Sequence, residues 1–395
     1  MSVQEGGVRE VADGVTGGRA EVADRDASAH EEPSRGNGVI GDAGFVSVWR
    51  HSVSGITALL RRGEGWLLDA KHALYGLAVT RILLGITILG TTLGEFTTRD
   101  YTYGVGGAWT GQIAEPQSDF IAMWPFSVTR ELANTPAGLL AVFAILLLLG
   151  VLFTVGYRTR LVMIPLFVVW VGFLGLCTYV QNQSDNLTRI AFIALAFCGL
   201  SDHWSLDARR GKRFARRDGN VLLRLWRGLP VLPSWLSVLA HNLGIVVLGA
   251  QICFVYSAGG LFKAGGEPWQ DGTAVYAPLQ TAQFGTWPIL SDIATAWGPA
   301  VGMATIGTVV IQSAFPLLLL RRGTRILALM VIMGFHVAIG VMMGLPWFSL
   351  AMIALDAIFV RDRSWRGFAR RAETLWRRVV SDARREPLVP EDDRG

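Results

Sequence analysis

The sequence predicts an all-α integral membrane protein, a polytopic helical bundle with about eight transmembrane helices. Hydrophobic residues make up 51% of its 395 residues and charged residues only 17%, against about 25% charged in ordinary soluble domains. Charge is concentrated in a few segments, and most stretches between them reach or approach the ~20 residues that a helix needs to cross the hydrocarbon core. The predicted spans cover residues 73–94, 138–156, 160–181, 187–201, 235–258, 297–320, 326–344 and 347–360.

These spans differ in length and polarity. The second includes residues 139–153, which are apolar on all sides and suit contact with lipid. The fourth and eighth are shorter than a full crossing. Ionisable residues within the spans include Arg81 in the first, Arg189 in the fourth, His336 in the seventh and Asp356 in the eighth.

The distribution of basic residues predicts the orientation. With eight spans, the segments on one side of the membrane contain 31 of the 36 Lys and Arg residues, and those on the other side contain only Arg99, Arg130 and Lys263. Cytoplasmic loops carry the excess of positive charge. Both termini are therefore predicted to be cytoplasmic, in the inner or plasma membrane.

The tails fit this topology. Residues 1–65 are predicted to be a disordered cytoplasmic tail, because their first 45 residues mix Gly, Asp, Glu and Arg with few large apolar residues. No basic start precedes a short apolar core, so we expect no cleaved signal peptide. Residues 361–395 form a basic cytoplasmic tail, compatible with a surface helix on anionic lipid. The positive charge thus indicates lipid contact and gives no support for nucleic-acid binding.

Two extracytoplasmic loops, residues 95–137 and 259–296, are long and rich in aromatics and glycine. Single aromatic residues at this level belong to the interfacial belt. Loops of this length with so many rings are expected to fold back as a lid over the span ends. The rings are those of Tyr101, Tyr103, Trp109, Trp124, Trp269, Tyr276, Phe284, Trp287 and Trp297.

Lys263 is the strongest candidate for chemistry. The chain has only three lysines, Lys71, Lys212 and Lys263, and the last follows a long apolar run. Partial desolvation lowers the pKa of an amine and makes it a usable base. The alternative is an interfacial lysine whose ammonium group snorkels to the lipid headgroups.

Further polar residues are predicted to form a pocket with Lys263 near the extracytoplasmic face. Asp185 and Arg189 are four residues apart, which permits an ion pair on one helix face. Titratable groups that converge in a partly dry pocket suit a proton-transfer or quinone site. The alternative for each intramembrane group is internal pairing that fixes helix packing. The candidates beside Lys263 are Glu267 and Asp271 as tuning carboxylates, with Asp185, Arg189, Trp269, His336 and Arg81 lining the pocket.

No metal site is predicted. The three cysteines, Cys177, Cys198 and Cys253, lie in or beside apolar spans without metal-ligand spacing, and we interpret them as small core residues. The sequence contains no HExxH motif, P-loop or GxSxG motif. Metal, nucleotide and acyl-enzyme chemistry therefore have no support.

Three segments resemble a known family. They are Trp204-Ser-Leu-Asp207; Tyr256-Ser-Ala-Gly-Gly-Leu-Phe-Lys263 with Trp269-Gln-Asp-Gly272; and His336 with Phe348-Ser-Leu-Ala-Met352 downstream. Their order and spacing resemble the horizontally transferred transmembrane (HTTM) domain family. This family shares its membrane unit with vitamin K-dependent gamma-carboxylases and includes the membrane protein that matures a secreted sporulation-delaying toxin. The resemblance covers roughly residues 70–360.

The resemblance implies a helical membrane fold with a pocket toward the extracytoplasmic side. In the carboxylases a lysine of the second segment acts as base on reduced vitamin K, and the alkoxide formed with O2 deprotonates a glutamate for CO2 addition. Lys263 is the lysine that matches, and a reduced, vitamin K-like quinone is the implied cofactor. The chain departs from the carboxylases in two respects. Ser184 and Asp185 replace their histidine before the fourth span, and we expect no large extracytoplasmic domain.

Three functions remain open from the sequence. The first is action on a secreted peptide or a quinone-like lipid at the extracytoplasmic face, with Lys263 as base. The second is a non-catalytic factor for maturation or export of a secreted peptide, in contact with the bilayer and with that peptide or a small membrane partner. A transporter is the third, and the lack of repeated spans or paired broken helices speaks against it.

Overall fold

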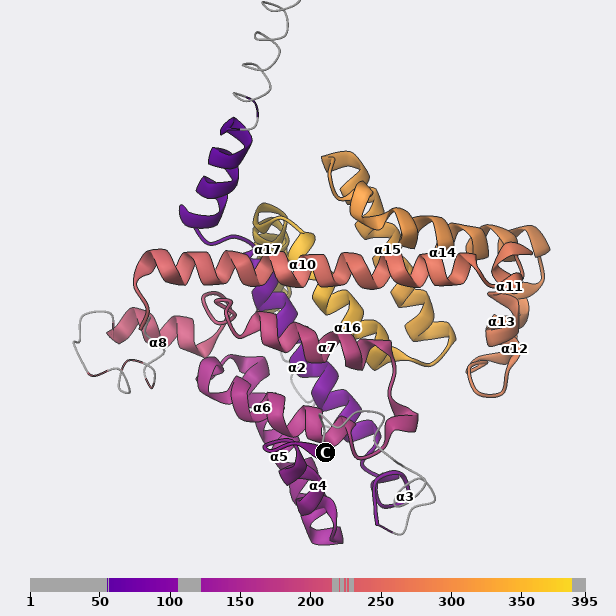
Figure 1. The fold of residues 1–395 in the computed structure, drawn as a ribbon, viewed down its shortest axis with the longest axis horizontal. Coiled ribbons are helices and arrows are strands. Elements are labelled where there is room, and N and C mark those ends of the chain that lie inside the picture. Colours follow the sequence, from indigo (N-terminus) through magenta and orange to yellow (C-terminus); the bar gives the residue numbers. More distant parts are fainter. Residues whose placement is uncertain are drawn as a thin grey trace, which may run out of the picture. The chain divides into compact units, whose positions relative to one another are not determined.

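The structure is a computed structural model. It describes residues 55, 57–105, 122–214, 220, 224, 226 and 231–385. Backbone contacts separate residues 1–59 from residues 60–395, and all the helices labelled in Figure 1 belong to the second unit. Within the described residues, regular secondary structure is entirely helical. The predicted all-α class is therefore confirmed.

Five helices are long and apolar enough to cross a membrane within the described residues. Each coincides with one of the predicted spans. They are α2 (Leu74–Gly94), α5 (Pro136–Val155), α10 (Ser234–Ala264), α14 (Gly298–Leu318) and α15 (Arg322–Met342).

Shorter helices occupy the other three predicted spans. They are α6 (Thr159–Leu174), α7 (Gln183–Leu195) and α16 (Pro346–Asp356), which continues into a 3₁₀ turn over Ala357–Phe359. The sequence predicts one helix over residues 160–181, but the helix in the structure is shorter. Helix α6 ends at Leu174 with Gly175 at its C-cap, and a separate 3₁₀ turn follows at Thr178–Val180. Whether these three short helices cross a bilayer remains a prediction.

Local sequence explains where the helices begin and end. At the start of α5 the Thr135 hydroxyl accepts a hydrogen bond from the Gly138 N–H at 3.0 Å, and Pro136 follows as the first helical residue. The same helix ends at Gly156, whose φ of 70° is a left-handed conformation that glycine adopts without strain. At α7, Asn182 and Asp185 form a capping box.

Helix α10 is the longest apolar helix. Its 31 residues correspond to roughly 46 Å at 1.5 Å per residue, well beyond a hydrocarbon core of ~30 Å. It continues past the predicted end at residue 258, so Lys263 lies in its last turn and not in a loop. The glycines at 259 and 260 do not stop it, because Gly260 packs directly against α14. A Cβ there would approach the Ser313 backbone nitrogen to 2.6 Å.

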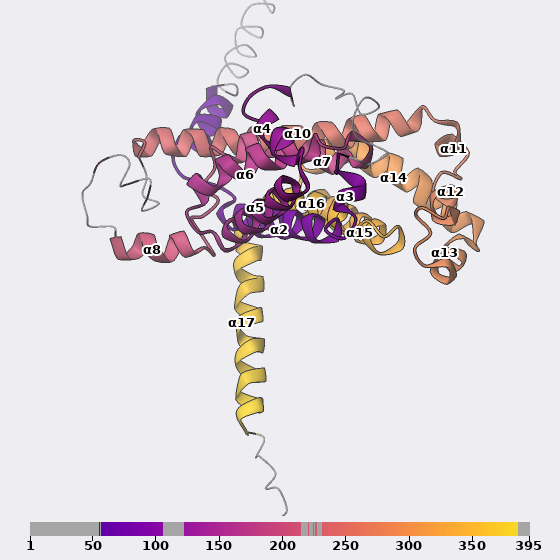
Figure 2. The same ribbon diagram turned by 90° about the horizontal axis from the view of Figure 1, so that it is seen from below.

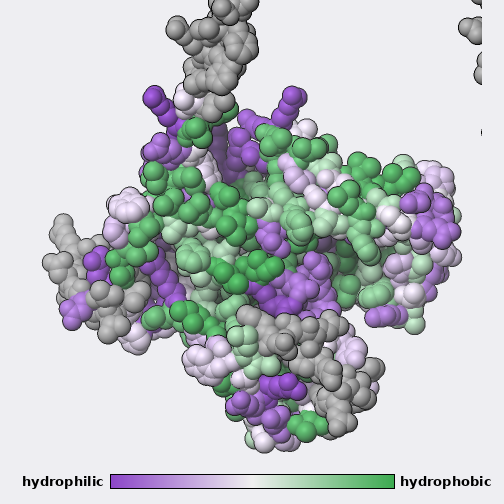
Figure 3. All heavy atoms as spheres, in the orientation of Figure 1, coloured by the Kyte–Doolittle hydropathy of each residue, from purple (hydrophilic) through white to green (hydrophobic). Residues whose placement is uncertain are grey.

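The helices pack in sequence-distant pairs. Helix α2 packs against α5 and α16, α10 against α14 and α7, and α15 against α16 (Figures 1 and 2). Buried apolar side chains fill the contacts, among them Leu84, Phe143, Ile252 and Phe315. Figure 3 shows hydrophobic residues over much of the surface of α10 and α14, with hydrophilic residues gathered at the α11 end. Such a surface suits lipid around the helices.

The segments outside the spans are partly helical. Residues 57–68 form a helix, so the predicted disordered tail over residues 1–65 is wrong for its last part. This stretch contains leucines and a tryptophan, unlike residues 1–45, which lie outside the described residues. The Ser205 hydroxyl accepts from the Ala208 N–H at 2.8 Å and caps α8 (Leu206–Phe214). The basic tail forms α17 (Asp362–Arg385).

The second aromatic loop contains three short helices, α11 (Glu267–Gln270), α12 (Tyr276–Gln280) and α13 (Pro288–Thr295). Helices α11 and α13 pack back onto α14. In the first loop the structure describes α3 (Arg99–Thr102) and α4 (Ser127–Ala133). Residues 106–121, with Trp109, lie outside the described residues.

Candidate active site

The last turns of α10 present a line of functional groups toward α14. Tyr256, Gly260 and Lys263 are spaced four and then three residues apart, which places them on one helix face. The half-buried Lys263 Nζ donates a hydrogen bond to Gln312 Oε1 at 3.0 Å and lies 3.5 Å from the Gly259 carbonyl oxygen. It also lies 5.5 Å from the centre of the Trp269 ring, a cation–π distance.

The close approach of α10 to α14 brings Gln312 to the lysine. At Gly260 an added Cβ would lie 2.5 Å from Ser313 Oγ, so only glycine fits there without movement. Gln312 is the residue before Ser313 and is itself buried. The glycine therefore sets the spacing that lets a side chain of α14 reach Lys263.

A fully buried polar network lies two turns before Lys263 along α10. The Tyr256 hydroxyl donates to Asp356 Oδ2 of α16 at 2.7 Å and lies 2.9 Å from His336 Nε2 of α15. All three side chains are at most 3% exposed. Phe315, Phe335 and Phe348 surround them, with ring centres 4.6 to 5.8 Å from the Tyr256 or His336 ring.

The protons of this network can be assigned from its geometry. Tyr256 has one hydroxyl proton and gives it to Asp356, so His336 Nε2 must carry the proton of the second hydrogen bond. The His336 Nδ1 and Asp356 Oδ1 atoms have no partner among the described residues. A proton that arrives at Nδ1 can then be passed on as the Nε2 proton moves to Tyr256 and the Tyr256 proton moves to Asp356. The network thus has the form of a short proton relay.

Lys263 lies about two turns beyond Tyr256 on the same face of α10. The lysine contacts α14, and the buried network reaches α15 and α16. Sequence reasoning singled out Lys263, Trp269 and His336; the structure places Trp269 beside the lysine and His336 in the network two turns away. Sequence reasoning did not select Gln312. It also did not identify Tyr256 as the residue that joins His336 to Asp356.

The two carboxylates expected to tune the lysine lie elsewhere. Glu267 and Asp271 belong to the exposed α11 turn after the end of α10, and neither forms an ion pair with Lys263 in the part of the chain that the structure describes. The oxygen nearest to Nζ comes from a neutral amide. The physical reason is the continuation of α10, which places the Lys263 amine beside Gln312 of α14.

Asp185 and Arg189 lie in a second cluster, around the start of α7. The Asp185 carboxylate accepts a hydrogen bond from the Asn182 N–H at 2.8 Å, and Arg189 donates to Asn186. The expected ion pair between Asp185 and Arg189 is absent from the described part of the chain, because each group has this local partner. Burial raises the pKa of Tyr103, the residue after α3, and the nearby carboxylates, Asp185 among them, raise it further.

Arg81 lies in a third cluster. It is buried on α2, and its Nη2 donates to the Trp204 carbonyl oxygen at 2.7 Å. Asp207 lies close by and caps α6, because its carboxylate accepts from the Arg158 and Thr159 N–H groups, both at 2.8 Å. Gly156, in the turn between α5 and α6, packs against Arg81 and Ser205 in this cluster. Arg81 therefore fixes packing between helix ends, and the Trp204 to Asp207 segment is its partner.

The three cysteines, read from the sequence as small core residues, are not paired with one another. Cys177 and Cys198 are buried, Cys253 is partly buried, and all three are free thiols. The described residues contain no group of three or more His, Cys, Asp or Glu side chains that could hold a metal ion.

Comparisons with protein-family models, with curated proteins and with solved structures give no match to this chain. The class of protein therefore follows from the fold alone. Within its described residues the chain is a helical protein with five helices long and apolar enough to span a membrane. The buried network of Tyr256, His336 and Asp356 lies two turns before the lysine at the end of the longest of these helices.

Proposed function

We propose that the chain is a bacterial inner-membrane protein of the HTTM family, with eight spans and both termini in the cytoplasm. The coincidence of a helix with each of the eight apolar segments supports the number of spans. The 31-to-3 division of basic residues supports the orientation. The family assignment is supported by the motifs alone, of which Tyr256 contacts His336 and Lys263 lies beside Trp269.

The proposed activity is proton abstraction at the extracytoplasmic face, with Lys263 as the base. Its substrate would be a lipophilic quinol or a side chain of a secreted peptide. The observation that carries the proposal is the set of partners of Lys263. A neutral amide at 3.0 Å orients the amine, and no carboxylate among the described residues holds its proton in an ion pair.

The buried network gives the proton a destination. In the proposed step the neutral Lys263 amine takes a proton from a substrate hydroxyl. The ammonium group can then pass a proton toward His336 Nδ1, from which it moves through Tyr256 to Asp356. No oxidant or covalent intermediate is required for this step. A reduced, vitamin K-like quinone fits as the substrate, because its ring is aromatic like Trp269 and its hydroxyl is the acidic group.

The surface beside Lys263 suits a lipophilic molecule or a peptide. Phe262, the residue before it, is 87% exposed. Helix α13 presents Ile289 and Ile293, four residues apart and both largely exposed. Exposed apolar groups of this kind are expected where a protein meets lipid or a partner.

The same surface favours the alternative function, a non-catalytic factor for the maturation or export of a secreted peptide. In that function the exposed residues of α13 would hold the peptide as it leaves the membrane, and Lys263 would have no role in a reaction. Lys263 distinguishes the two functions: the first requires its amine and the second does not.

The test is mass spectrometry of secreted peptides from cells with the gene, without it, and with Lys263→Met. We expect the Lys263→Met protein to reach normal levels in the membrane and to leave the product unmodified. Lys263→Arg serves as the control that retains the charge but cannot act as a base. A mass gain equal to one CO2 on glutamate would identify carboxylation. Full activity in Lys263→Met cells would exclude the lysine from the mechanism and leave the maturation factor.

A further inference from the structure

The start of α17 is fixed to the start of α2. The Asp362 carboxylate accepts hydrogen bonds from the Leu74 N–H at 3.1 Å and the Tyr75 N–H at 2.9 Å. These are unpaired N–H groups of the first turn of α2, which a carboxylate stabilises. The first turns of the basic helix are therefore held in a defined place beside the bundle.

From this point α17 runs crosswise to α10. In Figure 1 α10 lies in the plane of the view and α17 is seen nearly end-on, whereas Figure 2 shows α17 extending away from α10 and the other long helices. If α10 crosses the bilayer, a helix perpendicular to it follows the membrane surface. Interfacial helices take this direction.

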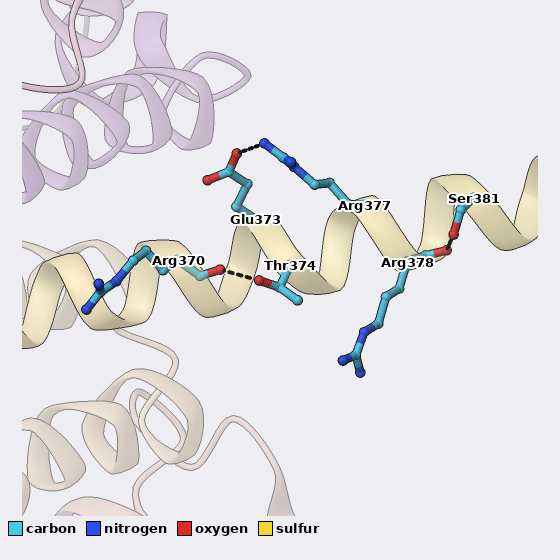
Figure 4. A pocket seen from close by; sticks show the side chains of 6 residues that line it. All are labelled: Arg370, Glu373, Thr374, Arg377, Arg378 and Ser381. Carbon is cyan, nitrogen blue, oxygen red and sulfur yellow. Dashed lines mark hydrogen bonds and ion pairs between the residues drawn. The ribbon is translucent and has the colours of Figure 1, made fainter.

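The two faces of α17 differ as they do in a helix at a lipid surface. Phe368, Leu375 and Trp376 share one face and are 66%, 60% and 69% exposed. The arginines gather on other faces, with Arg363, Arg366 and Arg370 along one side. In Figure 4, Arg370 and Arg378 point away from the ion pair between Glu373 and Arg377. The exposed apolar face can enter the boundary of the acyl chains while the arginines remain at the level of the headgroups.

A cavity of about 510 Å³ lies between the first turns of α17 and the bundle. Its wall contains three arginines that form no ion pair in the described part of the chain, because the one carboxylate of the wall, Glu373, is held by Arg377 at 2.5 Å. The Tyr75 ring lies 6.0 Å from the Arg366 guanidinium and 5.3 Å from the Trp204 ring. The cavity is lined by Tyr75, Trp204, Arg363, Arg366, Ala369, Arg370 and Glu373.

We propose that this cavity binds the phosphate headgroup of an anionic membrane lipid. Unpaired guanidinium groups recognise phosphate through paired hydrogen bonds. The two aromatic rings suit the level between acyl chains and headgroups. The exposed apolar face of the same helix indicates that the phosphate belongs to a lipid and not to a free anion. This site is separate from Lys263 and does not depend on the proposed reaction.

The experiment uses the full-length protein in a mild non-ionic detergent. Short-chain phosphatidylglycerol and phosphatidylcholine are titrated separately, and bound lipid is counted by native mass spectrometry. The pocket variant is Arg366→Gln with Arg370→Gln. The matched control is Arg371→Gln with Arg378→Gln, which removes the same charge from the same helix outside this cavity. Elution on size exclusion shows that both variants remain folded.

We expect phosphatidylglycerol to bind in preference to phosphatidylcholine. The pocket variant should bind phosphatidylglycerol on the order of tenfold more weakly, and the control should change by less than about twofold. An equal loss in both variants would assign the effect to the general charge of α17 and overturn the proposal. Displacement of the lipid by equimolar inorganic phosphate would show a free-anion site, which also overturns it.

Discussion

The Tyr256 hydroxyl donates a hydrogen bond of 2.7 Å to the Asp356 carboxylate and so joins α10 to α16 in the interior of the protein. The same oxygen contacts His336 on α15 at 2.9 Å. One hydroxyl thus connects three helices at a place where no solvent can replace it. Because an unsatisfied buried polar group is costly, this atom is expected to matter for stability as well as for proton movement.

Tyr256→Phe should lower the free energy of unfolding by about 1–3 kcal/mol, because it leaves Asp356 Oδ2 and His336 Nε2 without a partner. The measurement is thermal unfolding of the purified protein in detergent. Tyr276→Phe, at a half-exposed tyrosine, is the control and should change little. Adding Asp356→Leu to Tyr256→Phe should recover part of the loss, since the unpaired carboxylate is then removed. A wild-type melting temperature for Tyr256→Phe would contradict the bridging role.

Gly156→Ala should destabilise the cluster around Arg81. The residue has a φ of 70°, and an added Cβ would come within 2.5 Å of the Ser205 Cβ and closer still to Arg81 Nη1. A left-handed conformation alone costs an L-residue roughly 1–2 kcal/mol. Gly334→Ala in α15, where a Cβ meets nothing within 4 Å, is the matched control and should be neutral or slightly stabilising. Equal melting temperatures for the two variants would contradict the described turn.

The capping box at α7 predicts the behaviour of Asp185. Asp185→Ala should cost about 1 kcal/mol of stability through loss of the cap on the Asn182 N–H. Asp185→Asn should cost less, because the amide oxygen can still accept this hydrogen bond. Adding Arg189→Gln should not restore stability in either background, since no ion pair exists to be balanced. Rescue by Arg189→Gln in a thermal melt would show that the two charges interact directly.

The orientation can be tested by labelling single cysteines in whole cells. In a background with Cys177, Cys198 and Cys253 replaced by alanine, Glu267→Cys should react with a membrane-impermeant maleimide added outside the cells. Arg371→Cys in α17 should react only after the membrane is opened. The reverse pattern would place Lys263 in the cytosol and remove the proposed extracytoplasmic activity. Labelling of both positions in intact cells would indicate an even number of spans between them, instead of the three that the proposed topology places there.

The positions of the spans could be predicted from the sequence because length and apolarity decide which segments suit a bilayer. Each predicted span contains a helix. Their ends were harder to predict. Helix α6 stops at Leu174, earlier than expected, although Gly175 after it has an ordinary right-handed φ of −76°. Helix α10 runs further because Gly260 packs on α14. Both glycines stand in apolar runs, and the sequence alone does not show the tertiary contact that Gly260 makes.

The candidate site could be predicted in part. Lys263 and His336 stand out as ionisable residues in apolar surroundings, and Trp269 as an aromatic residue near the lysine. Gln312 carries a weaker signal, a single amide within an apolar helix, which needs a partner from another helix. The separation of Arg81 from Lys263 could be predicted from the depth of each residue along its span. It lies in the half of the first span nearer the predicted cytoplasmic side, whereas Lys263 lies near the opposite face.

The unbroken course of α10 has a mechanical consequence. Near its first turns, Asn242 is anchored by the carbonyl groups of Trp66, Leu67 and Ala70 at 2.9 to 3.1 Å, and its last turn carries Lys263. A continuous helix behaves as a stiff rod, so a sliding motion at one end is transmitted to the other. A displacement of about 1.5 Å, the rise of one residue, is enough to break the contact with Gln312. A displacement at the Asn242 end of α10 would in this way reach the Lys263 amine at its other end.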